Sequence, residues 1–147
     1  SPDIPVRRYM RCRDARGTLK LGKSEILYLE DGSEFRTPIP YQHGFEVADW
    51  DSDGKLDILA NQKCINVWYR NVGSNAAPRF RRELLKFYGR QISVSHHETS
   101  LKAIDWDRDG TLDLITGGES GMIYFFRRAT LEASERPGVS LGAVVTK

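Results

Sequence analysis

The sequence predicts an all-β protein built from β-propeller blades, and three observations support this class. Short runs of β-branched and aromatic residues alternate with Gly, Asn and Asp, which is typical of strands joined by tight turns. Helical periodicity is almost absent, and the best helix candidate is the short stretch 129–136. One segment also returns after 56 residues, and a unit of that length with about four short strands fits a propeller blade better than a solenoid coil.

The repeat is centred on an acidic segment. Residues 49–57 read DWDSDGKLD and residues 105–113 read DWDRDGTLD, so seven of nine positions are identical. Strand-like runs follow both copies, VWYR at 67–70 and YFFR at 124–127. This shared order predicts two units of the same local fold.

The flanks of the acidic segments define the expected elements. The first unit should have an inner strand ending near residue 49, strands at 56–60 and 65–70, a polar turn at 71–78 and an outer strand at 80–87. The second unit should begin near Thr99, with its third strand at 123–126. Residues 24–29 are expected to form a strand of a preceding, degenerate unit.

The chain therefore divides into three predicted parts. Residues 1–40 form a degenerate partial blade or an N-terminal extension, residues 41–98 the first blade, and residues 99–147 the second blade with a C-terminal tail. A closed propeller has about four to eight blades. The sequence holds two clear four-stranded blades plus part of a third, so we expect a fragment of a longer chain or a ring completed by other subunits.

Composition agrees with a folded domain and excludes some functions. The 147 residues include 22 Lys+Arg and 20 Asp+Glu, and 39% are hydrophobic, which is typical of globular rather than disordered chains. No run approaches the roughly 18 apolar residues of a membrane span, and the net charge of +2 argues against nucleic acid as a partner. Cys12 and Cys64 are too few for a zinc site or a disulfide framework, although one bridge remains open.

The acidic segments have the pattern of calcium-binding loops. Each places carboxylates at positions 1, 3, 5 and 9, a glycine at position 6 for the sharp turn, and a backbone carbonyl at position 7. Carboxylates packed so closely repel one another unless a cation neutralises them. An EF-hand is excluded because it needs a glutamate at position 12, where the two copies have Ala60 and Thr116. The alternative is an Asp-rich surface turn without a metal.

Residues 47–59, 67–71 and 76–80 together resemble an FG-GAP/VCBS repeat, the blade of integrin-α-like β-propellers. The second copy resembles this family through residues 117–124, and the resemblance extends over about residues 41–128. It implies a secreted, extracellular or periplasmic protein with two calcium sites. The implied ligands are Asp49, Asp51, Asp53, Asp57 and the Lys55 carbonyl in the first site, and Asp105, Asp107, Asp109, Asp113 and the Thr111 carbonyl in the second.

The family includes polysaccharide lyases, lectins and adhesion proteins, so two classes of function follow. In a lyase, a side chain such as His or Tyr takes the proton next to a uronate carboxylate, an acid protonates the leaving oxygen, and Arg neutralises the carboxylate. The residues that precede the inner strands should lie at the face opposite the calcium loops. The candidates are Tyr41, His43, His96 and His97 for proton transfer, and Arg79 and Arg90 for substrate binding.

The second class is a non-catalytic lectin, adhesion or protein-interaction propeller. Here Trp68, Tyr69 and Tyr88 stack on sugars or pack against a neighbouring blade. The histidines would then be ordinary turn or interface residues, and the adjacent pair with Glu98 could also bind a transition metal. In both classes the expected partner is a polysaccharide or glycoconjugate.

Position 2 of each acidic segment is tryptophan, Trp50 in the first copy and Trp106 in the second. Neighbouring residues in an extended loop point in opposite directions. Both indole rings should therefore point away from the metal and pack in equivalent places between neighbouring blades.

Overall fold

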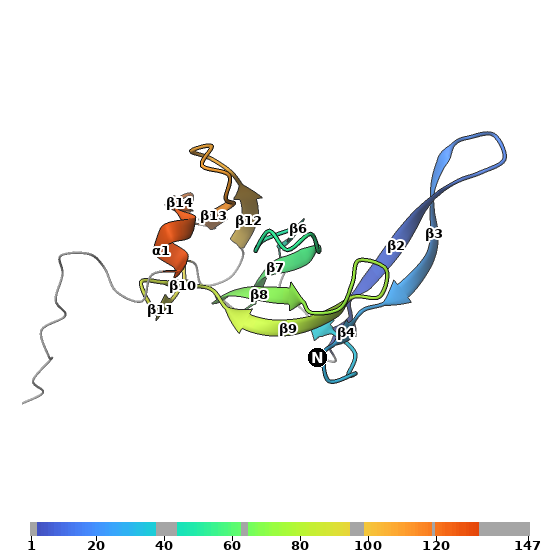
Figure 1. Cartoon of the computed structure of the whole chain (residues 1–147), viewed down its shortest axis with the longest axis horizontal. Helices are drawn as coiled ribbons and strands as arrows, with labels where there is room; N and C mark the ends of the chain where they lie inside the picture. The colour runs from blue at the N-terminus through green and yellow to red at the C-terminus, as the bar shows by residue number, and fades with distance from the viewer. Residues whose placement is uncertain (1–2, 38–43, 63–64, 95–98, 119, 133–147) are drawn as a thin grey trace, which may run out of the picture.

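The computed structural model describes residues 3–37, 44–62, 65–94, 99–118 and 120–132 (Figure 1). Almost all regular structure in these ranges is β-strand, and the one helix is α1 (Arg128–Glu132). The predicted all-β class is therefore confirmed. No helix within these ranges is long and apolar enough to cross a membrane.

The strands form one sheet of five strands, one of three and three pairs. Their order is β4-β9-β8-β7-β6 in the largest sheet, β12-β13-β14 in the next, and β1-β5, β2-β3 and β10-β11 in the pairs. The bounds are β1 (Ile4–Pro5), β2 (Arg7–Arg13), β3 (Leu19–Ile26), β4 (Tyr28–Leu29), β5 (Arg36–Thr37), β6 (Phe45–Ala48), β7 (Asp57–Gln62), β8 (Ile65–Asn71), β9 (Arg79–Leu84), β10 (Lys86–Phe87), β11 (Arg90–Gln91), β12 (Thr99–Ile104), β13 (Asp113–Gly118) and β14 (Ile123–Phe126).

The five-stranded sheet, called the central sheet below, contains the four strands predicted for the first unit. Strands β6, β7, β8 and β9 pair antiparallel in chain order, and β4 adds to the outer edge in parallel. Strands β7 and β8 lie within two residues of their predicted bounds, and two larger differences from the prediction occur. The outer strand ends at Leu84 because the chain then forms the β10–β11 hairpin, and the strand expected at 24–29 is divided at Leu27, whose side chain is buried.

The three-stranded sheet, called the second sheet, follows the prediction for the second unit. Strand β12 begins at Thr99, and β14 covers the expected stretch 123–126. Helix α1 follows where a short helix was expected, and residues 133–136 of that prediction lie outside the described part. The described residues supply three of the four predicted strands of this unit.

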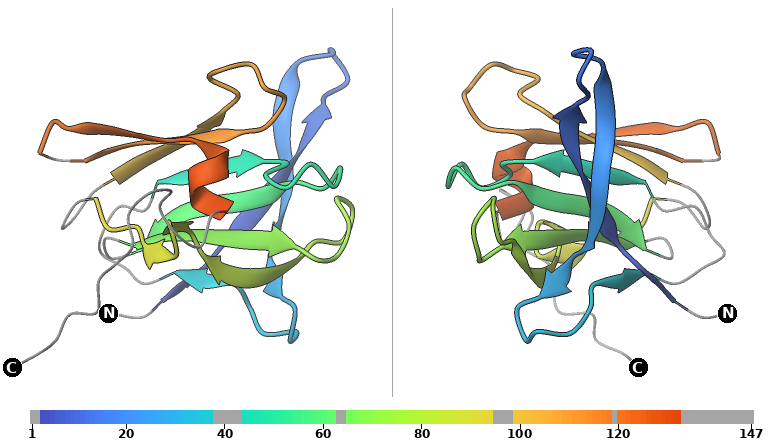
Figure 2. Two further views of the ribbon diagram at one scale, coloured as in Figure 1. Left: turned by 60° about the vertical axis from the view of Figure 1, so that its left-hand side comes forward. Right: turned by 90° about the vertical axis from the view of Figure 1, so that its right-hand side faces the viewer.

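Strand β7 is buried along almost its whole length because layers cover both faces of the central sheet. Alternate residues of a strand point to opposite faces. Accordingly, Ile58 belongs to one group of packed residues, the first core cluster, and Leu59 belongs to another, the second core cluster. Ile58 packs on the side of the N-terminal segment, where Phe35 lies 4.2 Å from Tyr69 between ring centroids. Leu59 packs with Leu114 of the second sheet, which is stacked on the central sheet in Figure 2.

The inner strands of the two sheets lie side by side. Strands β6 and β12 contact each other, and Lys102 Nζ lies 2.6 Å from Glu46 Oε2. The two residues occupy the same position in successive repeats. The repeat seen in the sequence is therefore a repeat of packing as well.

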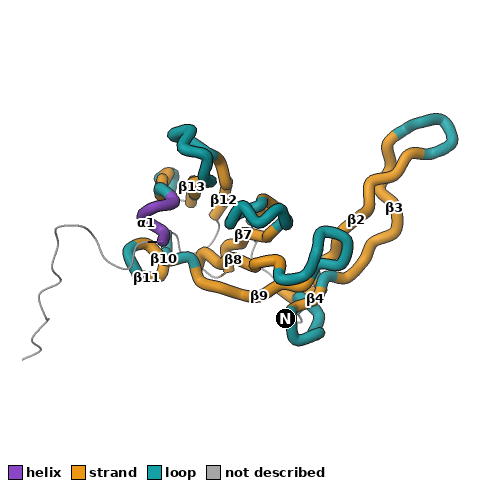
Figure 3. The backbone as a smooth tube through the Cα atoms, viewed as in Figure 1, coloured by secondary structure: helices purple, strands orange, loops and turns teal. Residues whose placement is uncertain are grey.

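The β2–β3 hairpin extends away from the two sheets (Figure 3). Cys12 lies on this hairpin, is exposed and carries a free thiol. Cys64 lies outside the described residues. The N-terminal part, predicted as a partial blade or an extension, thus combines a projecting hairpin with the short strand β4 on the central sheet.

Candidate functional site

The two acidic segments form equivalent loops. The first acidic loop, residues 49–56, joins β6 to β7, and the second acidic loop, residues 105–112, joins β12 to β13. Both follow an inner strand and precede the buried second strand of their unit. The repeat therefore places two similar acidic clusters at the same end of two neighbouring sheets.

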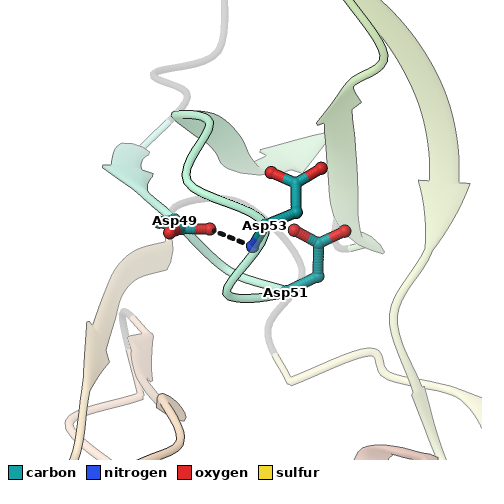
Figure 4. Close-up of side chains that lie close together, drawn as sticks. All are labelled: Asp49, Asp51 and Asp53. Atoms are coloured by element: carbon teal, nitrogen blue, oxygen red, sulfur yellow. Dashed lines mark hydrogen bonds between the residues drawn. The ribbon is translucent and has the colours of Figure 1, made fainter.

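Backbone hydrogen bonds shape both loops in the same way. The Asp49 carboxylate accepts hydrogen bonds from the amides of Asp53 (3.0 Å) and Gly54 (2.9 Å) (Figure 4). The sharp turn requires positive φ, at Gly54 (83°) and also at Ser52 (59°), and glycine adopts such values without strain. In the second loop the Asp105 carboxylate accepts the same bonds from Asp109 (3.0 Å) and Gly110 (3.1 Å), with positive φ at Arg108 and Gly110.

Each loop gathers three carboxylates that could hold one metal ion. Oxygen atoms of Asp49, Asp51 and Asp53 lie within 4.8 Å of one another, and the second loop repeats this with Asp105, Asp107 and Asp109. Figure 4 shows the first group over one turn of the loop. Calcium binds oxygen at about 2.3–2.6 Å, so ligand oxygens around one ion are at most about 5 Å apart. The spacing fits an ion of that size.

Asp51 provides an independent indication that the first loop fits a cation. Its side chain is only 12% exposed, and within the described residues its Oδ1 has no hydrogen-bond donor. A buried carboxylate oxygen without a partner is costly. A bound cation would remove this cost.

Positively charged side chains lie at the edge of both carboxylate clusters. The sequence analysis did not predict them. Arg70 Nη2 is 2.7 Å from Asp51 Oδ2, and Lys55 Nζ is 2.8 Å from Asp53 Oδ2. The hydrogen bond from Lys55 is the main reason why the pKa of Asp53 is lowered. In the second loop Arg127 lies 3.6 Å from Asp107. The signal was available, since both arginines end the strand-like runs of the repeat.

Asp57 and Asp113, predicted as ligands at position 9, are fully buried and hold their own strands in place. Asp57 accepts hydrogen bonds from the Asn71 amide (2.7 Å) and Trp68 Nε1 (3.0 Å). Asp113 accepts hydrogen bonds from the amides of Arg128 (2.8 Å) and Trp106 (3.3 Å). Burial raises the pKa of Asp57, an effect that these hydrogen bonds partly offset. Neither residue belongs to the groups of three, and their role as ligands stays a prediction.

The role predicted for position 7, a calcium ligand through the backbone carbonyl of Lys55 or Thr111, also stays a prediction. In the part of the chain that the structure describes, the hydrogen bonds of Lys55 and Thr111 involve atoms other than the carbonyl oxygen. The Lys55 amide donates to Asp53 (2.9 Å), and the Thr111 amide donates to Asp109 (2.8 Å). The Thr111 hydroxyl also donates to Asp109, and this bond is the main cause of the lowered pKa of that carboxyl group.

The prediction for the two tryptophans is right for Trp50 and wrong for Trp106. Trp50 is 3% exposed, with the guanidinium carbon of Arg128 4.2 Å from its ring centroid. Trp106 is 63% exposed, and its ring centroid lies 6.0 Å from that of Phe125 in its own sheet. The reason is that the second sheet covers Trp50, whereas no sheet in the described residues covers the equivalent face around Trp106.

The four candidates for proton transfer, Tyr41, His43, His96 and His97, lie outside the described residues. The two candidate arginines are described, and they line separate hollows. Arg79 lies 5.1 Å from the ring centroid of Tyr28, and Arg90 shares its hollow with Phe87. The structure does not bring the two guanidinium groups together.

The aromatic residues proposed for sugar stacking have different surroundings. Tyr69 is 3% exposed and packs in the core next to Phe35, so its ring is not available to a sugar. Trp68 is half-buried against the second core cluster. Tyr88 is half-buried, 4.6 Å from Phe87 between ring centroids. The other predicted role, packing against a neighbouring blade, stays a prediction, and Tyr69 packs against Phe35 of the N-terminal segment.

Comparison with protein families identifies the repeat. Residues 49–116 match the model of the FG-GAP-like repeat, a span that contains both acidic loops. This stretch is therefore an FG-GAP-like repeat, and the predicted resemblance is confirmed. Such a repeat suggests a β-propeller interaction domain. The chain has no match among the curated proteins or among the solved structures that were compared.

Proposed function

We propose that this chain is a calcium-stabilised segment of an extracellular β-propeller that binds other molecules. The observation that carries this proposal is the pair of equivalent three-carboxylate clusters in an FG-GAP-like repeat. Calcium is the preferred ion because it takes many protein oxygens in flexible geometry, whereas magnesium keeps more of its water.

Calcium in these sites would act on structure. Asp49, Asp51 and Asp53 would hold the first ion, and Asp105, Asp107 and Asp109 the second. The ion would neutralise carboxylates that now depend on arginine and lysine, and it would brace the turn that carries Trp50 into the core. Binding would therefore stabilise the packing of the central sheet against the second sheet.

Calcium should raise the melting temperature of the protein. A ligand that binds only the folded state at a hundred times its Kd contributes about 2.7 kcal/mol, or about 5–10 °C for a chain of this size. Circular dichroism melts with saturating EGTA and with excess calcium give this difference directly. The double variant D51N/D107N should have the same melting temperature in EGTA and in calcium, equal to that of the unmodified protein in EGTA.

Asp3→Asn is the matched control, because it removes one exposed carboxylate outside both loops. It should keep the full response to calcium. Identical melting of the unmodified protein with EGTA and with calcium would rule out calcium stabilisation.

We also propose a polysaccharide or glycoconjugate as the bound molecule. Arg79 and Arg90 support this, because both are exposed and line surface hollows that also contain an aromatic residue, Tyr28 for Arg79 and Phe87 for Arg90. An arginine can pair with a sugar carboxylate or sulfate, and an aromatic ring can pack on the apolar face of a sugar.

The catalytic form of this proposal is a polysaccharide lyase. If His96 or His97 transfers the proton, replacing it with alanine should lower turnover by roughly 10²–10⁴-fold. The absorbance of unsaturated uronate products measures this, with unchanged melting as the check on folding. A lack of product with the unmodified protein and a panel of uronate polymers would contradict the lyase and leave the non-catalytic interaction.

A further inference from the structure

The central sheet and the second sheet present equivalent faces. On the central sheet, Leu59 and Trp68 are cross-strand partners, and Trp50 joins them from the first acidic loop. In the second sheet Ile115 and Phe125 are the corresponding cross-strand partners. The tryptophan of the second acidic loop, Trp106, lies beside Phe125.

The two equivalent faces differ in whether they are covered. The second sheet covers the face of the central sheet and leaves Trp50 only 3% exposed. The same face of the second sheet is open among the described residues, with exposed fractions of 63% for Trp106, 44% for Ile104 and 41% for Phe125. Trp106 and Phe125 are in contact, and adjoining exposed apolar side chains of this kind are typical of interaction surfaces.

The covered copy shows what kind of site holds this tryptophan. Trp50 lies in one core cluster with Leu114, and Ala103 and Leu112 pack against the same cluster. Arg128 adds a cation over the indole face and donates a hydrogen bond to the Trp50 carbonyl. The site is thus an apolar wall with a guanidinium at its edge.

The chain carries a second, open version of this site on the other side of the central sheet. The repeat equivalents of Ala103, Leu112 and Leu114 are Val47, Leu56 and Ile58, and all three line one apolar hollow of about 190 Å³. Leu27, Pro78 and Phe80 add to its apolar wall, and Asn71 and Asn75 line it as well. Val47 is 58% exposed and Leu56 50% exposed.

A guanidinium lies at the edge of this hollow too. Arg8 lines it and donates hydrogen bonds to the carbonyls of Asn75 (3.0 Å) and Ala76 (2.7 Å). Its guanidinium also forms an ion pair with Glu25 at 2.7 Å, as that of Arg128 does with Glu132 at 2.6 Å. Arg8 comes from the N-terminal hairpin and is not the repeat equivalent of Arg128. The hollow therefore offers the same chemistry, an apolar wall and a cation, from different residues.

We propose that copies of this chain associate head to tail, with Trp106 of one copy inserted into the hollow around Val47 and Leu56 of the next. Both halves of the contact lie on one chain and on opposite outer layers, so the occupant is a second copy. Such a heterologous contact closes into a ring or continues as a filament. The proposal rests on the blade interpretation given above, but it needs neither calcium nor a glycan.

Sedimentation velocity of the full chain, from micromolar to near-millimolar concentration, tests the association. We expect the average mass to rise with concentration. Trp106→Ser should weaken the association at least about tenfold, because buried tryptophans dominate such interfaces. Val47→Glu, in the hollow, should have the same effect. Leu21→Ser, which replaces an exposed leucine of the β2–β3 hairpin, is the control and should change nothing.

Mixing the two variants gives the decisive result. W106S keeps the hollow and V47E keeps the tryptophan, so together they should form a one-to-one complex that grows no further. Far-UV circular dichroism of each variant reports whether it is folded. Monomers at every concentration, or no complex in the mixture of folded variants, would overturn the proposal. Calcium-dependent melting is measured separately, so failure here leaves the proposed function intact.

Discussion

Replacing Trp50 with alanine is expected to lower the free energy of unfolding by about 3–5 kcal/mol, as truncation of a buried tryptophan does. Trp106→Ala is expected to change it by less than about 0.5 kcal/mol, because the side chain is 63% exposed. The two variants make the same chemical change at the same loop position. Their difference therefore measures the contribution of the residues that cover Trp50, which come from the second sheet and from α1.

The loss at Trp50 has two identifiable sources. The indole ring fills space among Leu59, Leu114 and Leu85 between the central and second sheets, and its removal leaves a cavity there. Arg128 also loses the ring beneath its guanidinium, although the hydrogen bond to the backbone carbonyl of residue 50 remains possible.

Urea unfolding followed by circular dichroism measures both variants. The protein concentration must be low enough to keep the chain monomeric, because association through Trp106 would add to its apparent effect. Equal losses for the two variants would contradict the interpretation that the second sheet buries Trp50 and that an equivalent neighbour is missing for Trp106.

The tryptophans also show what the sequence could not predict. Residues 49–57 and 105–113 are so similar that any local argument assigns both rings the same surroundings. The burial of each tryptophan depends instead on whether a neighbouring sheet packs over it, and the sequence of the loop does not determine that. Exposure of Trp106 is therefore information that only the three-dimensional structure supplies.

Strand positions were easier to predict because the pattern and the packing agree. Strands β8 and β14 combine β-branched and aromatic residues, and both start at the expected residue. The prediction of the outer strand of the first unit was wrong at its C-terminal end. Leu85 and Ile92 pack in the second core cluster, and the β10–β11 hairpin forms between them. A tertiary contact decided that boundary.

In the candidate site, residue spacing predicted the two clusters of three carboxylates but not the roles around them. The arginines at the cluster edges lie outside the loops, Arg70 in β8 and Arg127 directly after β14, so spacing within the loop alone does not reveal them. Position 9 is a different case. Asp57 begins a strand buried on both faces, and a carboxylate there must be satisfied by neighbouring donors.

Replacing Asp57 with alanine is expected to lower the free energy of unfolding by about 3–5 kcal/mol, with or without calcium. The carboxylate is fully buried and accepts hydrogen bonds from the Asn71 amide and Trp68 Nε1. Each buried donor left without an acceptor costs about 1–3 kcal/mol. Asp51→Ala is the matched control from the same loop, because its carboxylate accepts no hydrogen bond within the described residues and pairs only with the half-exposed Arg70.

Urea unfolding of both variants in EGTA and in excess calcium separates the two roles of these aspartates. In EGTA, Asp51→Ala should cost less than about 1 kcal/mol, because a partly exposed ion pair contributes little. In calcium it should cost about as much as the ion contributes. Asp57→Ala should lose its full 3–5 kcal/mol already in EGTA, and any additional loss in calcium measures its part as a ligand. A small loss for Asp57→Ala in EGTA would contradict the structural role assigned to this carboxylate, since the two donors would then have found other acceptors.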